Sequence, residues 1–192
     1  MQATAERMTL EDYLANGPEW PDGQRVEWIN DQAYAMSGAS ALHAAVTANA
    51  IAALTVALRG SGCRATTADQ RVWIPTTGAW LYPDVTVICG PYEVADEDRH
   101  SVTNPTVVVE VLSPSTRSYE LGAKGEHYRS LPTLQHLLFV DPVERRVALY
   151  TRTAEGWLLR DLHEGEVPLE GVGVSLPLAE LFADLAQVPT TP

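Results

Sequence analysis

Two acidic residues stand beside apolar runs that are typical of buried β-strands. Glu110 lies near the end of the run from Thr106 to Leu112, and Asp84 directly precedes the run Val85–Ile88. An ionised carboxylate in such a place costs several kcal/mol unless it is paired, hydrogen-bonded or bound to a metal. If the two strands are neighbours, both carboxylates converge at one end of a sheet and repel each other unless a proton or cation separates them.

A hard divalent cation suits such a pair, because Mg²⁺ prefers oxygen ligands from a few carboxylates and water. The sequence therefore predicts a site for Mg²⁺ (or Mn²⁺) at Asp84 and Glu110. A simpler interpretation stays open at this point. In that interpretation Asp84 caps its strand, and Glu110 pairs with an arginine.

Lys124 is the single lysine among 13 basic residues. In a helix expected from about Tyr119 to Leu131, it shares one face with Leu121 and Tyr128, at spacings of three and four residues. That apolar face should pack on the sheet, so Lys124 should point inward. The alternative is an exposed pair with Glu120, which precedes it by four residues in the favourable order.

The elements that must position these residues follow from hydrophobic periodicity and turn residues. We expect helices starting near Thr9, from about Ser40 to Arg59, from about Tyr119 to Leu131, and over Pro177–Leu185. We expect further strands over Arg25–Ile29, Gln32–Met36, Cys63–Thr67, Arg71–Ile74, Gln135–Val140, Val147–Thr151, Trp157–Leu162 and Val172–Leu176. The first two form a hairpin around Asn30 and Asp31. This order favours an α/β (mixed α+β) fold, with a mixed sheet flanked by helices.

Length and composition indicate one globular domain. The chain has 192 residues, of which 45% are hydrophobic, and we expect a single domain over residues 9–185 with flexible termini at 1–8 and 186–192. No apolar run is long enough to span a bilayer, so no membrane partner is expected. Cys63 and Cys89 lie outside any CxxC spacing, which favours reduced thiols of a cytoplasmic protein and argues against a zinc site.

The formal net charge of −12 argues against a protein held on nucleic acid by a broad basic surface. It leaves open a nuclease whose site is built from carboxylates and works only with divalent cations.

The pair Pro83-Asp84, followed by Glu110-Val111-Leu112, resembles the PD-(D/E)XK nuclease signature, with Leu112 at the position of the signature's lysine. From about Thr9 to Leu185 the chain also resembles the Uma-two family of putative restriction endonucleases. The segments that carry this second resemblance are Val26–Ile29, Tyr34–Ser37, Val108–Thr116, Leu121–Lys124 with Tyr128, and Phe139–Pro142 with Arg146-Val147.

The resemblance implies a restriction-endonuclease-like fold, in which a central mixed β-sheet is flanked by helices. It implies Asp84 and Glu110 as metal ligands and Lys124 as the replacement for the lysine missing at Leu112. Glu27 matches the acidic residue on the first element that completes such sites.

The function that follows is metal-dependent hydrolysis of DNA phosphodiester bonds. A metal at Asp84 and Glu110 would activate a water, Glu27 would bind a second metal directly or through water, and Lys124 would orient the water or stabilise the transition state. His43 and Gln70 are further candidates for substrate contact, although a helix-surface histidine is the commoner case.

Two other functions stay open. The first is a catalytically silent interaction or structural module on the same fold, and the second is a metal-dependent phosphodiesterase acting on RNA. We expect a homodimer, because cutting both strands of a duplex with one site per chain is simplest with two chains.

Overall fold

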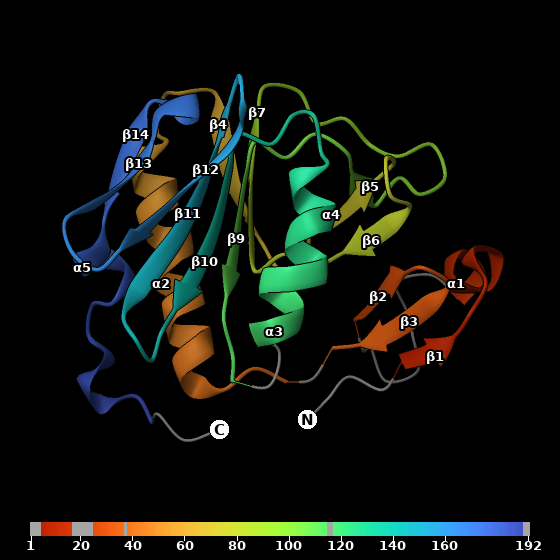
Figure 1. Cartoon of the computed structure of the whole chain (residues 1–192), viewed down its shortest axis with the longest axis horizontal. Coiled ribbons are helices and arrows are strands. Elements are labelled where there is room, and N and C mark those ends of the chain that lie inside the picture. Colours follow the sequence, from red (N-terminus) through yellow and green to blue (C-terminus); the bar gives the residue numbers. More distant parts are fainter. Residues whose placement is uncertain (1–4, 17–24, 37, 115–116, 190–192) are drawn as a thin grey trace.

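The computed structural model describes residues 5–16, 25–36, 38–114 and 117–189. Over these residues the strands form two six-stranded sheets and one two-stranded ladder (Figure 1). The first sheet contains β1 (Ala5–Arg7), β2 (Val26–Ile29), β3 (Gln32–Ala35), β5 (Arg71–Ile74), β6 (Ala79–Leu81) and β8 (Ser101–Val102), in the order β1-β3-β2-β6-β5-β8. The second contains β4 (Cys63–Thr67), β7 (Val85–Cys89), β9 (Val107–Val111), β10 (His136–Asp141), β11 (Arg146–Thr153) and β12 (Gly156–Leu162), in the order β12-β11-β10-β9-β7-β4. The ladder pairs β13 (Glu166–Leu169) with β14 (Val174–Pro177).

The helices lie between and around these sheets. They are α1 (Leu10–Asn16), α2 (Ala41–Ala57), α3 (Arg117–Tyr119), the π-helical turn η2 (Glu120–Lys124), α4 (Gly125–Arg129), the 3₁₀ turns η3 (Glu170–Val172) and η4 (Leu185–Gln187), and α5 (Leu178–Leu181). None of the described helices is both long and apolar enough to cross a membrane.

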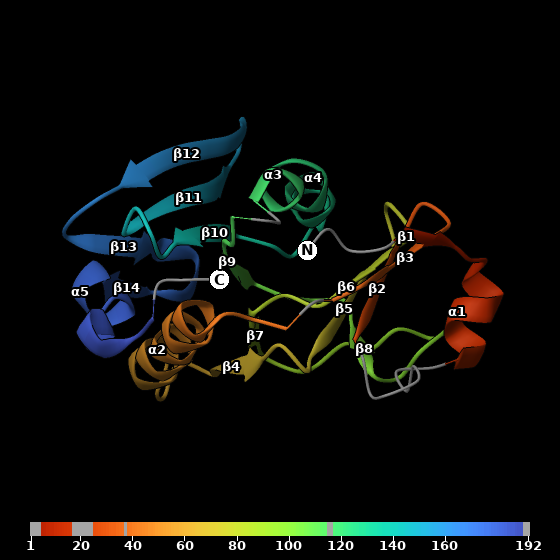
Figure 2. The ribbon, with the colours of Figure 1, turned by 90° about the horizontal axis from the view of Figure 1, so that it is seen from below.

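The second sheet is mixed, because β9 pairs parallel with β10 and antiparallel with β7. Figure 2 shows α2 on one side of these central strands and the α3–α4 segment on the other. Val109 and Val111 pack in the core that contains α2, whereas Val108 and Leu112 pack with Tyr128 of α4. Since side chains alternate along a strand, Glu110 lies on the α4 side.

Most expected elements are confirmed. The long helix spans Ala41–Ala57 and is capped by Ser40, whose Oγ accepts a hydrogen bond from the backbone N–H of His43 at 3.2 Å. The hairpin turns at Asn30 (φ 50°) and Asp31 (φ 58°), the two positive φ angles that a type I′ turn requires.

Other expectations were wrong in detail. Residues 5–7, which we expected to be part of a flexible terminus, form β1 by pairing with β3, and the expected flexible tail begins inside η4. Strands β8 and β13 are not among the strands expected from the sequence. Such short strands carry little periodicity, so their existence depends on long-range partners.

The expectation of two reduced cysteines was also wrong. Cys63 and Cys89 form a disulfide that joins β4 to β7, where the two residues lie directly opposite each other. The register between β4 and β7 brings the two cysteines together. The spacing of the cysteines along the chain does not predict this pairing. The cysteines therefore no longer support a cytoplasmic location, because disulfides are rare in cytosolic proteins.

Reduction of the Cys63–Cys89 bond is expected to lower the free energy of unfolding by about 3 kcal/mol. The bond closes a loop of 26 residues, which gains conformational freedom in the unfolded chain when the link is removed. Urea unfolding with and without reductant measures the change, and Cys63→Ser is the control because its midpoint should not respond to reductant. An unchanged midpoint for the parent protein would contradict this prediction.

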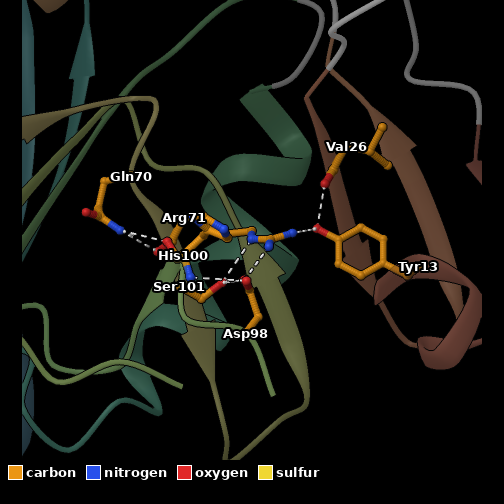
Figure 3. A network of polar contacts seen from close by, with 7 residues as sticks. All are labelled: Tyr13, Val26, Gln70, Arg71, Asp98, His100 and Ser101. Atoms are coloured by element: carbon orange, nitrogen blue, oxygen red, sulfur yellow. Dashed lines mark hydrogen bonds and ion pairs between the residues drawn. The ribbon is translucent and has the colours of Figure 1, made fainter. Parts of the chain in front are cut away.

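A buried arginine ties the first sheet to α1 and to the segment before β8 (Figure 3). Arg71 of β5 forms an ion pair with Asp98, donates from Nε to Oγ of Ser101 at 2.9 Å, and donates from Nη1 to the Tyr13 hydroxyl at 3.1 Å. The Tyr13 hydroxyl donates in turn to the carbonyl of Val26 at 2.8 Å. Hydrogen bonds from Ser101 and the Arg71 charge outweigh burial and lower the pKa of Asp98.

Arg71→Met is expected to lower the free energy of unfolding by about 3 kcal/mol, because the Asp98 carboxylate, 10% exposed, would lose its counter-charge. The matched control is Arg25→Met, which breaks an ion pair with the exposed Asp69 and should cost less than about 1 kcal/mol. Guanidinium unfolding of the two variants beside the parent compares them. Equal losses in the two variants would contradict the prediction.

Candidate active site

Asp84 and Glu110 lie at the same end of two paired strands. In the antiparallel pairing of β7 and β9, Val85 lies opposite Val109, and one further step in this register places Asp84 opposite Glu110. The backbone N–H of Val111 donates to Oδ2 of Asp84 at 2.7 Å. The structure thus brings together the two carboxylates that the sequence predicts to converge.

Lys124 reaches the same point from the helical side. Its ammonium lies 2.8 Å from Oε1 of Glu110 and 2.8 Å from Oε1 of Glu27. Only 3% of Lys124 is exposed. The alternative of a solvent-exposed pair with Glu120 is therefore wrong.

Glu27 comes to the site from β2 of the other sheet. Its Oε1 also accepts a hydrogen bond from the backbone N–H of Tyr82 at 2.9 Å, two residues before Asp84. Oε1 of Glu110 accepts a second bond from the hydroxyl of Tyr128 at 2.6 Å. Lys124 therefore links a strand of each sheet, and Tyr128 fixes the Glu110 carboxylate from α4.

The helix that carries Lys124 is widened by one π-helical turn. The backbone N–H of Gly125 donates to the carbonyl of Glu120, and the turn buries the side chains of both Glu120 and Lys124. A Cβ at Gly125 would meet Phe139 of β10 at 3.1 Å. The glycine thus lets the helix lie close to the sheet, which shortens the reach of Lys124 to Glu110.

Sequence periodicity missed Glu120, a fourth buried carboxylate near the other three. It affects the pKa values of Glu110, Lys124 and His43. A π turn changes the residue spacing for one turn only. The available signal was the four-residue spacing to Lys124, which entered the sequence analysis only as the alternative of an exposed pair.

Of the two candidate substrate residues, one lies at this site. Nε2 of His43, on α2, is 3.2 Å from Oδ2 of Asp84. The side-chain amide of Gln70 donates to the backbone carbonyls of Arg71 and His100. Gln70 therefore belongs to the Arg71 network in Figure 3, and its predicted substrate contact has no support from this placement.

The site carries an excess of negative charge. Burial raises the pKa of Glu110 well above its usual value; Lys124 opposes this change, while Asp84, Glu120 and Glu27 add to it. Burial alone would lower the pKa of Lys124, but Glu110 and Glu27 outweigh burial and raise it. Lys124 thus stays charged, and the remaining carboxylates favour a further cation or a proton.

The donor set fits a divalent cation held by two carboxylates. The contacts described above use Oδ2 of Asp84 and Oε1 of Glu110. None of these contacts involves Oδ1 of Asp84 or Oε2 of Glu110, so these two atoms could serve as oxygen ligands. Within the described ranges, no three His, Cys, Asp or Glu side chains are gathered into a group that could hold a metal. One or two carboxylates with waters are the usual Mg²⁺ environment, so a three-residue group is not required.

The chain has relatives that match it over most of its length. Two relatives from Synechocystis sp. are described as uncharacterized proteins. One is 32% identical over 187 residues, covering 94% of this chain and 94% of the relative. The other is 32% identical over 161 residues, covering 83% and 90%.

A crystal structure described as a putative nuclease belonging to DUF820, from Anabaena variabilis, has a TM-score of 0.72 at 17% identity. The match covers 91% of this chain and 97% of that chain. At this identity the likeness shows the fold, which is the restriction-endonuclease-like fold expected from the sequence.

A family model described as "Uma2: Putative restriction endonuclease" matches residues 10–179. This range contains the central strands of both sheets. It also contains the carboxylate–lysine cluster, which consists of Glu27, Asp84, Glu110 and Lys124. The chain belongs to the Uma2 (Uma-two) family of putative restriction endonucleases.

Proposed function

We propose that this protein is a Mg²⁺-dependent endonuclease that hydrolyses DNA phosphodiester bonds. The observation that carries the proposal is the contact of Lys124 with Glu110 at 2.8 Å. It supports the idea that the ammonium missing at Leu112 is supplied from the following helix. Family membership and the nuclease described for the Anabaena structure support a hydrolase acting on nucleic acid.

In this proposal the carboxylates of Asp84 and Glu110 would hold the metal. The bound ion would supply an activated water and stabilise charge on the phosphate oxygens. Lys124 is the point charge next to the developing negative charge, where a preorganised cation acts most strongly. Val111 N–H and the Tyr128 hydroxyl hold the two carboxylates in place.

Glu27 has one clear task in this scheme, which is to hold the Lys124 ammonium together with Glu110. Its predicted role as a ligand of a second metal stays a prediction. Its Oε1 is already engaged by Lys124 and by the backbone N–H of Tyr82. A water-mediated contact through Oε2 is the form of that role that fits these bonds.

The proposal also covers how DNA reaches the site, the oligomeric state and the cellular location. With a formal charge of −12, divalent cations are needed to bring DNA to the site. We propose a homodimer through the β10–β12 meander, because β12 is an edge strand that exposes Leu158 and Leu159. Sedimentation velocity would measure this assembly. The cytoplasmic location stays a proposal without support from the cysteines.

A substrate panel tests the function directly. Supercoiled plasmid, single-stranded DNA and RNA would each be incubated with the protein in Mg²⁺, in Mn²⁺ and in chelator. Metal-dependent nicking of plasmid is the expected result. Cleavage of RNA alone would favour the phosphodiesterase alternative. No cleavage together with no Mn²⁺ binding in a calorimetric titration would favour the silent module.

A further inference from the structure

Helix α2 delivers one side chain to the carboxylates from the face of the sheet opposite Lys124. Its first turn is fixed by the Ser40 cap on the backbone N–H of His43. On its buried face, Leu42 and Val46 pack in the same core as Val109 and Val111. The position of the His43 ring relative to the sheet is therefore set by packing as well as by the cap.

His43 contacts the metal-binding carboxylate itself. Its Nε2 lies 3.2 Å from Oδ2 of Asp84, and the two side chains are 16% and 10% exposed. The same Oδ2 accepts the N–H of Val111 at 2.7 Å. One oxygen of Asp84 thus has two polar partners within hydrogen-bonding distance, the N–H of Val111 on β9 and Nε2 of His43 on α2.

The chemistry of the pair fixes which ring nitrogen carries the proton. A carboxylate only accepts hydrogen bonds, so Nε2 of His43 must be the donor. Nδ1 of the same ring is buried and has no hydrogen-bond partner among the described residues. Among the described residues, the contact with Asp84 is therefore the polar contact that orients the His43 ring.

The two carboxylates are held in the same manner from opposite sides. Lys124 occupies Oε1 of Glu110 from the π turn, and His43 occupies Oδ2 of Asp84 from α2. In neither case does the contact involve the other oxygen of the carboxylate, which could therefore bind a ligand. A carboxylate that could rotate freely about its last bond would offer either oxygen, and ordering it on metal binding would cost conformational entropy.

We propose that His43 is a positioning residue of the metal site: its Nε2–H holds Asp84 so that Oδ1 faces the divalent cation. This assignment rests on the proposed function, since the cation is the group that Asp84 would bind there. It differs from direct substrate contact, the role suggested by the sequence. Residues that orient a ligand in this way typically contribute 10–100-fold to metal affinity.

Calorimetric titration of Mn²⁺ into the parent and three variants tests the assignment. His43→Ala removes the donor, and His43→Gln keeps an N–H at the place of Nε2. His163→Ala is the matched control, because His163 faces the exposed Asp161 through the same pair of atoms at 3.6 Å. We expect Mn²⁺ affinity to fall about 10–100-fold in His43→Ala, to recover most of the loss in His43→Gln, and to stay unchanged in His163→Ala.

Two results would overturn the assignment while leaving the proposed function in place. One is parent-like Mn²⁺ affinity in His43→Ala, with or without a change in KM. The other is His43→Gln as weak as His43→Ala, which would indicate lost packing. A parent protein that binds no Mn²⁺ would end the proposed function and this assignment together, before any variant is compared.

A second readout works without metal and without a variant. In the parent, ¹⁵N chemical shifts of the His43 ring report which nitrogen carries the proton in the neutral form. Protonation at Nε2 is the expected result. A ring protonated at Nδ1 alone would overturn the assignment, even if His43→Ala failed to fold.

Discussion

Asp84→Asn is expected to abolish Mg²⁺-dependent plasmid cleavage, with a loss of at least about 100-fold, because the metal supplies several kcal/mol of transition-state stabilisation. The amide still offers an oxygen to the N–H of Val111, so the fold should be kept. Plasmid nicking at fixed Mg²⁺ measures the activity, and circular dichroism measures the fold.

The matched control for this change is Asp161→Asn. Asp161 is half-exposed on β12, where it pairs with Arg146, and its substitution should leave cleavage unchanged. If Asp84→Asn nicked plasmid as fast as the control, Asp84 could not be a metal ligand. The mechanism given above would then be wrong.

Lys124→Met is expected to have the largest effect on stability. It leaves Glu27 and Glu110 buried without their shared counter-charge, which costs about 3–5 kcal/mol of unfolding free energy. Cleavage should be lost as well, because no ammonium would remain beside the carboxylates. Denaturant unfolding and plasmid nicking measure the two effects separately.

The loss in Lys124→Met should depend on pH in a defined direction. The pKa of Glu110 is already raised in the folded protein and rises further when the ammonium is removed. When the pKa of a carboxyl is higher in the folded than in the unfolded protein, the folded state binds its proton more tightly. Stability is therefore kept at a pH below the unfolded-state pKa and is lost as the pH rises through the folded-state pKa. The deficit relative to the parent should therefore be largest at neutral pH and shrink toward acid pH.

Lys124→Arg separates the two roles of the lysine. It keeps a positive charge, so most of the stability should return. The planar guanidinium replaces a compact ammonium, however, and cleavage should stay low. A Lys124→Met protein as stable as the parent at neutral pH would contradict the buried-charge account.

Sequence reasoning found the residues whose type conflicts with their surroundings. Glu110 in an apolar strand and Lys124 on an apolar helix face both needed a partner, and each proved to be the other's partner. The strand pairing that joins Asp84 to Glu110 follows from two buried runs separated by one loop. Local patterns were sufficient here because each pattern was interrupted by a charge.

Other parts of the site could not be predicted, because they depend on register and helix geometry. The π turn that buries Glu120 and the cross-strand pairing of Cys63 with Cys89 leave no periodic signal in the chain. The contact of His43 with Asp84 joins a helix to the end of a strand 41 positions away in the sequence. The structure alone shows that these residues meet.

The most direct test of the central claim is anomalous diffraction from crystals grown with Mn²⁺. The claim is that Asp84 and Glu110 jointly hold a divalent cation beside Lys124. It predicts an anomalous peak within coordination distance of Oδ1 of Asp84 and Oε2 of Glu110, with the Lys124 ammonium still next to Glu110. A crystal grown with saturating Mn²⁺ that shows no peak there, or shows its peak at other side chains, would contradict the claim.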